Sequence, residues 1–306
     1  SLDHQFGADA RPVAYVAPEE RRVFRGYRRK EGRAGTRNTI VVISTVNCAA
    51  HTVRRIVHRA RAELLPRFAN VTDIVALTHR HGCAMRDYGL EYDMLQRTLA
   101  GFARHPNVAG CLFVGLGCEV NQYSALIAAQ QARLEGADLP LYVGIQEVGG
   151  VANAIEQGVQ AVARLLPYAD GFHREDLPIS ELALALQCGG SDGFSGITAN
   201  PALGYASDLL VAQGGTTVLA ETPEIYGAEH LLTRRAVSDA VGSKLLERVR
   251  WWEEYTAREG AEIDNNPAPG NKAGGLTTIF EKSLGAVAKG GSMPLQAVYE
   301  YAEPIG

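Results

Sequence analysis

The chain has 306 residues, of which 46% are hydrophobic, and its 30 basic and 34 acidic side chains give a formal net charge of -4. This length is enough for one large domain or two ordinary ones, and we expect two. Charges of both signs are interleaved without a basic stripe, so nucleic acid is not expected as a partner. No stretch approaches the roughly 18 uncharged apolar residues of a membrane-spanning helix, and no signal pattern opens the chain. We therefore expect a soluble, cytoplasmic protein without a membrane partner.

Residues 1–23 are expected to form a linker or arm. They are polar, contain Pro12 and Pro18, and show no sustained periodicity. The chain opens on Ser1-Leu2 without a methionine, which is typical of a cloning remnant. We therefore expect the natural protein to begin further upstream.

A regular alternation of strands and helices follows and predicts a first domain over residues 24–172. Apolar, β-branched runs predict buried strands at 39–44, 73–77, 110–114 and 141–144. Helical periodicity predicts helices at about 50–65, 88–104, 121–135 and 150–166. Four strands alternating with helices predict an α/β fold with a parallel, doubly wound, Rossmann-like sheet.

A stretch rich in charge and turn formers, Pro167 to Pro178, predicts a break before a second α/β domain over residues 173–306. Strands are expected at 181–186 and 216–220, and helices at about 200–213, 223–236, 238–259 and 276–289. The chain ends soon after Gly290-Gly291 without a clear closing element. We therefore expect this domain to be incomplete at its C-terminus.

Cysteines follow three of the first four predicted strands, namely Cys48, Cys83 and Cys118. Ligands of parallel sheets collect at the carboxyl ends of strands, where helix N-termini also favour the thiolate. Three thiolates would suit iron, as a single ion or as a cluster with an open position. The alternative is that they are small buried hydrophobes, since none has a CxxC spacing. The residues alone leave both interpretations open.

Other strand ends and loops carry further candidates. His79 and His81 are either ligands or proton carriers, or else ordinary loop histidines. Glu221, Glu224 and His230 lie in one stretch after a predicted strand, where a carboxylate can bind a cation, abstract a proton or complement a helix dipole. Residues 270–275, which include Lys272, predict a cradle for a carboxylate but do not match a P-loop.

Several short motifs occur along residues 24–305, and their combination is distinctive. They are Gly26-Tyr27-Arg28, Thr36-Arg37-Asn38, Thr45-Val46-Asn47-Cys48, Gly115-Leu116-Gly117-Cys118-Glu119, Leu186-Gln187-Cys188-Gly189-Gly190-Ser191-Asp192, Ser195 to Pro201, Glu221 to His230, and Pro269 to Gly285. Together they resemble the altronate/galactarate dehydratase family. Residues 4–12 resemble the linker after the family's small N-terminal SAF-type domain, whereas Ala84 stands where Gly is expected.

The resemblance implies a hydro-lyase that eliminates water from an aldonic or aldaric acid, such as D-altronate or D-galactarate, to give a 2-keto-3-deoxy acid. It implies Fe2+ as cofactor, with Mn2+, another divalent ion or an iron–sulfur cluster as the alternatives. It also implies an SAF-type domain of the same enzyme as a partner, and we expect a homo-oligomer. The reaction needs a base that takes the proton from C2, a cation that stabilises the enediolate, and an acid or metal that assists departure of the C3 hydroxyl. The residues expected in these roles are Glu221, His230 and Lys272 for catalysis, Arg37, Asn271, Ser191, Asp192 and Asn200 for substrate binding, and Cys48, Cys83 and Cys118 for the metal.

Two other functions compete with this interpretation. The large subunit of sulfolactate sulfo-lyase resembles the same family and eliminates sulfite instead of water. The linker-like residues 4–12 favour a fused dehydratase, because that lyase carries its small domain on a separate chain. A catalytically silent fragment that binds sugar acids is the third possibility.

Overall fold

The computed structural model describes residues 5–30, 32, 34–134 and 141–305, and its contacts divide the chain into two compact units. Residues 24–177, with the segment from Tyr299 onward, form what we call the sheet unit. The segment up to Val23 and residues 178–298 form the pocket unit. Among the described residues, no helix combines the length and the apolar character needed to cross a membrane.

The sheet unit contains a four-stranded parallel sheet with the order β4-β3-β5-β6. Its strands are β3 (Thr39–Ser44), β4 (Asp73–Leu77), β5 (Val108–Gly115) and β6 (Leu141–Gly144). All four predicted strands are confirmed, and β5 extends beyond its predicted ends. The chain winds outward from β3 to β4 and then crosses to β5 on the other side. The sheet therefore has its topological switch point between β3 and β5.

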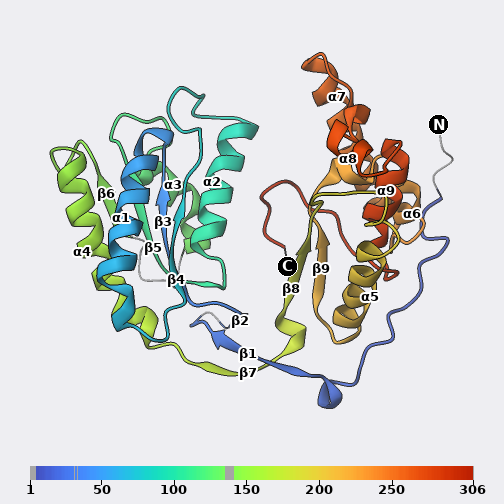
Figure 1. The fold of residues 1–306 in the computed structure, drawn as a ribbon, viewed down its shortest axis with the longest axis horizontal. Helices are drawn as coiled ribbons and strands as arrows, with labels where there is room; N and C mark the ends of the chain where they lie inside the picture. Colours follow the sequence, from blue (N-terminus) through green and yellow to red (C-terminus); the bar gives the residue numbers. More distant parts are fainter. Residues whose placement is uncertain (1–4, 31, 33, 135–140, 306) are drawn as a thin grey trace. The chain divides into compact units, whose positions relative to one another are not determined.

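Helices cover both faces of this sheet, which confirms the doubly wound α/β prediction (Figure 1). On one face lie α1 (Ala50–Glu63) and α4 (Val151–Asp170), and on the other lie α2 (Leu90–Ala103) and α3 (Tyr123–Leu134). Residue 135, included in the predicted third helix, lies outside the described residues.

Alternate residues of β3 belong to two separate hydrophobic cores, one on each face of the sheet. Ile40 and Val42 pack with α1 and α4, whereas Val41 and Ile43 pack with α2 and α3. Burial on both faces explains why the strand is an uninterrupted apolar run. Helices α1 and α4 also approach closely, because a Cβ added to Gly158 would lie 2.3 Å from Cδ1 of Ile56.

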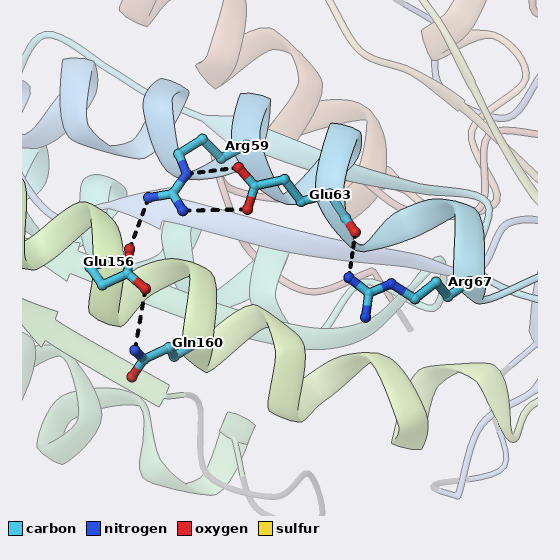
Figure 2. A network of polar contacts seen from close by, with 5 residues as sticks. All are labelled: Arg59, Glu63, Arg67, Glu156 and Gln160. Atoms are coloured by element: carbon cyan, nitrogen blue, oxygen red, sulfur yellow. Dashed lines mark hydrogen bonds and ion pairs between the residues drawn. The ribbon is translucent and has the colours of Figure 1, made fainter.

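A polar network joins the outer surfaces of α1 and α4 (Figure 2). The guanidinium of Arg59 donates to both carboxylate oxygens of Glu63 and to Glu156, at 3.0–3.3 Å. Gln160 donates to Glu156, and Arg67 donates to the main-chain oxygen of Glu63. These groups are partly exposed, so the packing of the helices rather than the ion pairs supplies most of the stability.

The break predicted from Pro167 to Pro178 starts too early, since α4 continues through Pro167 to Asp170, but the division between the units falls within it, after Leu177. Proline removes one main-chain donor, and so near the C-terminal end of a helix it costs a single hydrogen bond. Residues of the expected linker instead form β7 (Arg174–Pro178). This strand belongs to a small sheet of order β2-β1-β7, with β1 (Val23–Arg28) antiparallel to β2 (Ala34–Gly35). The strands of this small sheet were not predicted.

The pocket unit is built on two parallel strands, β8 (Ala183–Leu186) and β9 (Thr216–Leu219), both within predicted ranges. Its helices are α5 (Ala199–Ala212), α6 (Glu229–Thr233), α7 (Asp239–Arg258), α8 (Pro269–Ala273) and α9 (Ile279–Ala288). Short 3-10 turns lie at Pro18–Glu20, Ile179–Glu181, Thr222–Ile225 and Ile263–Asn265 in this unit, and at Asn47–Ala49 and Leu65–Arg67 in the sheet unit.

The single helix predicted over 223–236 is wrong. The chain makes the turn Thr222–Ile225 and begins α6 only at Glu229. Gly227 separates the two with a φ of +84°, and a Cβ there would lie 2.1 Å from the ring of Phe280. Glycine is favoured at such a backbone angle, so the helical pattern is interrupted here.

The N-terminal segment runs along the pocket unit. The main-chain N–H groups of Gly7 and Asp9 donate to the oxygens of Thr233 and Arg234, and Val16 donates to Ala212. Residues 1–4 of the expected linker lie outside the described residues.

Candidate functional site

A pocket lies at the carboxyl ends of β8 and β9. Residues from the loop after β8, from the turn after β9 and from α9 line it. The side chains with polar groups are Gln187, Cys188, Ser191, Asp192, Ser195, Asn200, Glu224, Glu281, Lys282 and Lys289. The pocket therefore brings together the predicted substrate-binding residues Ser191, Asp192 and Asn200.

Asp192 organises the loop after β8. Its Oδ1 accepts hydrogen bonds from the main-chain N–H groups of Phe194 and Ser195, at 2.9 and 2.7 Å, and from the Ser195 hydroxyl at 3.0 Å. The bonds from Ser195 and Phe194 hold the pKa of the Asp192 carboxyl below its usual value. Much of this carboxylate's bonding capacity is thus used within the loop.

Asn271 connects that loop to α8. Its Nδ2 donates to the main-chain oxygen of Ser191 at 2.8 Å, and its Oδ1 accepts from the N–H of Ala268 at 3.0 Å. Lys272, the next residue, has an exposed side chain and does not line the pocket. The predicted carboxylate cradle is therefore the short helix α8, whose Asn271 holds the pocket loop in place.

Glu224 and Lys289 form a buried ion pair at the pocket wall. Their side chains are 1% and 4% exposed, and the Lys289 ammonium donates to Oε2 of Glu224. Burial raises the pKa of the Glu224 carboxyl, and the neighbouring ammonium opposes that shift. Sequence reasoning missed Lys289, although a lysine after the apolar run Ala286-Val287-Ala288 is a signal that could have found it.

Glu221 and His230 lie on either side of Glu224 in the sequence. Glu221 follows β9, and one of its carboxylate oxygens lies within 4.8 Å of ligand atoms of both Cys188 and Glu224. His230 lies in α6, does not line the pocket, and has a buried Nδ1 without a hydrogen-bond partner among the described residues. Glu221 thus lies beside the pocket, whereas His230 is not among the residues that line it.

The three cysteines predicted as metal ligands lie on neighbouring loops of the sheet unit. Cys48, Cys83 and Cys118 are all exposed in the loops that follow β3, β4 and β5. Hydrogen bonds join these loops, from Asn47 N–H to the His81 oxygen at 2.9 Å and from Asn121 N–H to the Gly82 oxygen at 3.1 Å. Partial desolvation and the neighbouring Cys48 and Cys118 raise the pKa of the Cys83 thiol.

Two buried or half-buried groups shape this edge of the sheet. Glu119 accepts hydrogen bonds from the Thr45 hydroxyl at 2.7 Å and from the N–H of Gly117 at 2.5 Å, which fixes the loop bearing Cys118. His79 contacts the Ser44 oxygen through Nε2 at 2.9 Å, and desolvation lowers its pKa. His81 is exposed nearby.

Arg37 lies elsewhere in the sheet unit. It precedes β3, at the opposite end of the strand from the cysteine loops. Its main-chain N–H donates to the side chain of Asn107, its oxygen accepts from Arg29, and its side chain is exposed. Within this unit Arg37 therefore lies apart from Cys48, Cys83 and Cys118.

A doubly wound sheet and a separate α/β unit, both with chemically active side chains at their strand ends, define the chain as a two-unit α/β protein. Residues 26–170 match the family model "D-galactarate dehydratase/Altronate hydrolase, second domain". Residues 179–306 match the model "D-galactarate/Altronate dehydratase, C-terminal". The chain belongs to the D-galactarate/altronate dehydratase family, which confirms the resemblance.

Three relatives cover most of the chain. It is 39% identical to altronate dehydratase of Bacillus subtilis, covering 94% of this chain and 56% of the relative. It is 38% identical to galactarate dehydratase (L-threo-forming) of Escherichia coli, covering 96% and 57%. It is 32% identical to (2R)-sulfolactate sulfo-lyase subunit beta of Chromohalobacter salexigens, covering 88% and 64%. The chain thus spans just over half the length of the dehydratases that it matches.

Proposed function

We propose that this chain is the catalytic part of a hydro-lyase that removes water from a sugar acid. The substrate is an aldonate or aldarate, such as D-altronate or D-galactarate, and the product is a 2-keto-3-deoxy acid. The observation that carries the proposal is the pocket of the pocket unit, which is lined by Glu224, Lys289 and the hydroxyl and amide of Ser191 and Asn200, with Glu221 beside Glu224. The names of two relatives, altronate dehydratase and galactarate dehydratase, support it.

The chemistry of the elimination assigns roles to these side chains. Loss of water begins when a base takes the acidic proton at C2, beside the carboxylate. Glu221, at the end of β9 and less buried than Glu224, is the base in this proposal. Ser191 and Asn200 bind substrate hydroxyls, and buried Lys289 adds positive charge near the enediolate that forms. His230 and Lys272, which do not line the pocket, remain predictions as catalytic groups.

Iron is the proposed cofactor, and the three thiols Cys48, Cys83 and Cys118 of the sheet unit are its proposed ligands. Thiolates on three joined loops suit iron, which when bound supplies a Lewis acid. Among the described residues these sulfurs do not form a set with all distances within 4.8 Å. Mn2+ or another divalent ion is the alternative, and anaerobic metal analysis of Cys48→Ser, Cys83→Ser and Cys118→Ser tests the assignment: full metal retention in every variant would exclude it.

We further propose that the enzyme is cytoplasmic, is a homo-oligomer, and contains an N-terminal SAF-type domain. The short coverage of the relatives supports the presence of additional sequence in the whole protein.

The proposal is tested with the full-length enzyme, reconstituted anaerobically with iron. Aldonates, aldarates and sulfolactate are offered, and keto acid and sulfite are measured. Turnover of a hexonate or hexarate is expected, and Glu221→Gln should lower kcat by about 100-fold or more. Arg59→Ala, on the outer surface of α1, is the control and should keep full activity. Sulfite release without dehydration of any sugar acid would show a sulfo-lyase, and substrate binding without turnover a silent sugar-acid-binding protein.

A further inference from the structure

Two cysteines of the sheet unit lie on segments that pack directly against each other. The N–H of Asn47 donates to the main-chain oxygen of His81 at 2.9 Å, which joins the segment after β3 to the segment after β4. A Cβ added to Gly82 would lie 2.4 Å from a main-chain oxygen of the segment after β3, so the two chains approach closely here. Cys48 directly follows Asn47, and Cys83 directly follows Gly82. The main chain therefore brings these two cysteines into one small region.

The side chains of this pair are exposed and in contact with each other. Both Cys48 and Cys83 are exposed, so a small oxidant in the solvent can reach them. The thiol of Cys83 donates a hydrogen bond to the sulfur of Cys48. A disulfide bond is about 2.05 Å long, so two sulfurs that are already in hydrogen-bond contact need only a short approach to form one.

The third thiol of this region, Cys118, lies on a more firmly held loop. The neighbouring Glu119 is 3% exposed and accepts hydrogen bonds from two main-chain N–H groups of that loop and from the Thr45 hydroxyl. The three sulfurs do not all lie within 4.8 Å of one another. Because Cys48 and Cys83 are joined by a hydrogen bond, the distance that exceeds this limit is one that involves Cys118. The geometry therefore separates one pair from a third thiol.

We propose that Cys48 and Cys83 form a reversible disulfide in the iron-free protein, with hydrogen peroxide as the oxidant. One thiol loses its proton and attacks an oxygen of the peroxide. The O–O bond breaks, the sulfur becomes a sulfenic acid, and the other oxygen leaves as hydroxide and takes up a proton. The second thiolate then attacks the sulfenic sulfur, the S–O bond breaks, and a second hydroxide leaves and is protonated. Two thiols and one peroxide thus give one disulfide and two waters, and the two electrons lost by the sulfurs reduce the peroxide.

The disulfide has a consequence for the metal. It engages two of the three thiols proposed as iron ligands, so the oxidised protein should not take up iron until a dithiol reduces the bond. This consequence rests on the proposed function, whereas formation of the disulfide does not. Disulfides of cytoplasmic proteins are usually transient and catalytic or redox-sensing, and two exposed thiols in contact fit the redox-sensing kind.

Peptide mass spectrometry of the oxidised protein identifies the bond. Trypsin releases Cys48 within residues 38–54, Cys83 within residues 81–86, and Cys118 together with Cys111 within residues 105–133. Iron-free protein treated with equimolar hydrogen peroxide should give residues 38–54 linked to residues 81–86. The chain has five cysteines, so the free thiols counted after denaturation should fall from five to three. Dithiothreitol should restore all five.

Serine variants separate the pair from the third thiol. Cys48→Ser and Cys83→Ser should each abolish the linked peptides, whereas Cys118→Ser is the matched control and should leave them unchanged. Circular dichroism confirms that each variant is folded. Absence of the linked peptides from the oxidised wild type, or a linkage through Cys118 in place of either partner, would overturn the proposal.

Anaerobic iron binding, measured before oxidation, after oxidation and after reduction, tests the consequence for the metal. Iron uptake should be lost on oxidation and recovered with dithiothreitol. Linked peptides in a protein that binds no iron even when reduced would uphold the disulfide and refute only the proposed iron site. Iron uptake without any linked peptides after oxidation would uphold the iron site and overturn the disulfide.

Discussion

Replacement of Lys289 by methionine should destabilise the pocket unit strongly. The variant removes the ammonium from Glu224, whose side chain is 1% exposed, so water cannot replace it. Loss of one partner from a buried pair costs about 3–5 kcal/mol. Protonation of the Glu224 carboxyl would remove this buried charge. For a glutamic acid of ordinary pKa, about 4.3, protonation costs about 3.7 kcal/mol at pH 7. We therefore expect a loss of roughly 3–4 kcal/mol at neutral pH.

The pH dependence of this loss has a definite sign. A carboxyl whose pKa is raised in the folded state destabilises the protein while the unfolded chain is ionised, and the penalty disappears as the pH falls. At about pH 5 the cost of protonation is only about 1 kcal/mol. The stability difference between the Lys289→Met variant and the wild type should therefore shrink between pH 7 and pH 5.

Urea denaturation followed by tryptophan fluorescence measures this difference in one unit alone. The chain has two tryptophans, Trp251 and Trp252, and both lie in α7 of the pocket unit. EDTA is included so that a bound cation cannot replace the missing ammonium. Lys282→Met, which removes an exposed bond to Asn266, is the control and should cost less than about 1 kcal/mol. The double variant Lys289→Met with Glu224→Gln should recover most of the loss; equal instability of the single and double variants would refute the reasoning.

Three further outcomes are expected in the sheet unit. Gly158→Val should lower its stability by about 1–3 kcal/mol, because the new side chain meets Ile56, and a thermal melt followed by circular dichroism that matches the wild type would contradict this close packing. Arg59→Ala should cost less than about 1 kcal/mol in the same melt, since its ion pairs are partly exposed, and a larger loss would show that the network matters more than its exposure suggests. Iodoacetamide labelling of Cys83, followed by peptide mass spectrometry, should need a higher pH than labelling of free cysteine, because desolvation and Cys48 raise its pKa; labelling that is already maximal near pH 7 would argue against this environment.

The sequence predicted the large sheet well and the small sheet not at all. Strands such as β3 and β4 are apolar on both faces, so their composition is a strong signal. β2 has two residues and β7 is mostly charged and exposed, so neither carries a hydrophobic pattern. The pairing of β7 with β1 also joins segments that are distant in sequence, which periodicity cannot reveal.

Helix ends were harder to predict where one residue decides them. A proline interrupts most helices, yet α4 tolerates Pro167 close to its C-terminus. Gly227 interrupts a pattern that is otherwise helical, because its positive φ and the contact with Phe280 are properties of the folded chain. In both cases the tertiary environment outweighs local propensity.

The site was predicted in its positions more than in its pairings. The rule that polar groups gather at strand ends pointed to Glu221, and the family resemblance pointed to Ser191 and Asp192. The buried partner Lys289 lies on α9, far along the chain from Glu224. The apolar run before Lys289 is a local signal for a buried lysine, but it does not reveal that Glu224 is the partner.

The interleaving of the two units along the chain affects how the protein can be made in parts. Residues before Val23 bind along the pocket unit, whereas the segment from Tyr299 belongs with the sheet unit. During synthesis, the main body of the sheet unit is therefore complete before most of the pocket unit has been made. The N-terminal segment can form its hydrogen bonds only after its acceptors Ala212, Thr233 and Arg234 have been synthesised. A gene fragment cut at residue 178 would separate that arm from them. Permuting the arm onto the end of residue 298 would instead keep the pocket unit's own segments together.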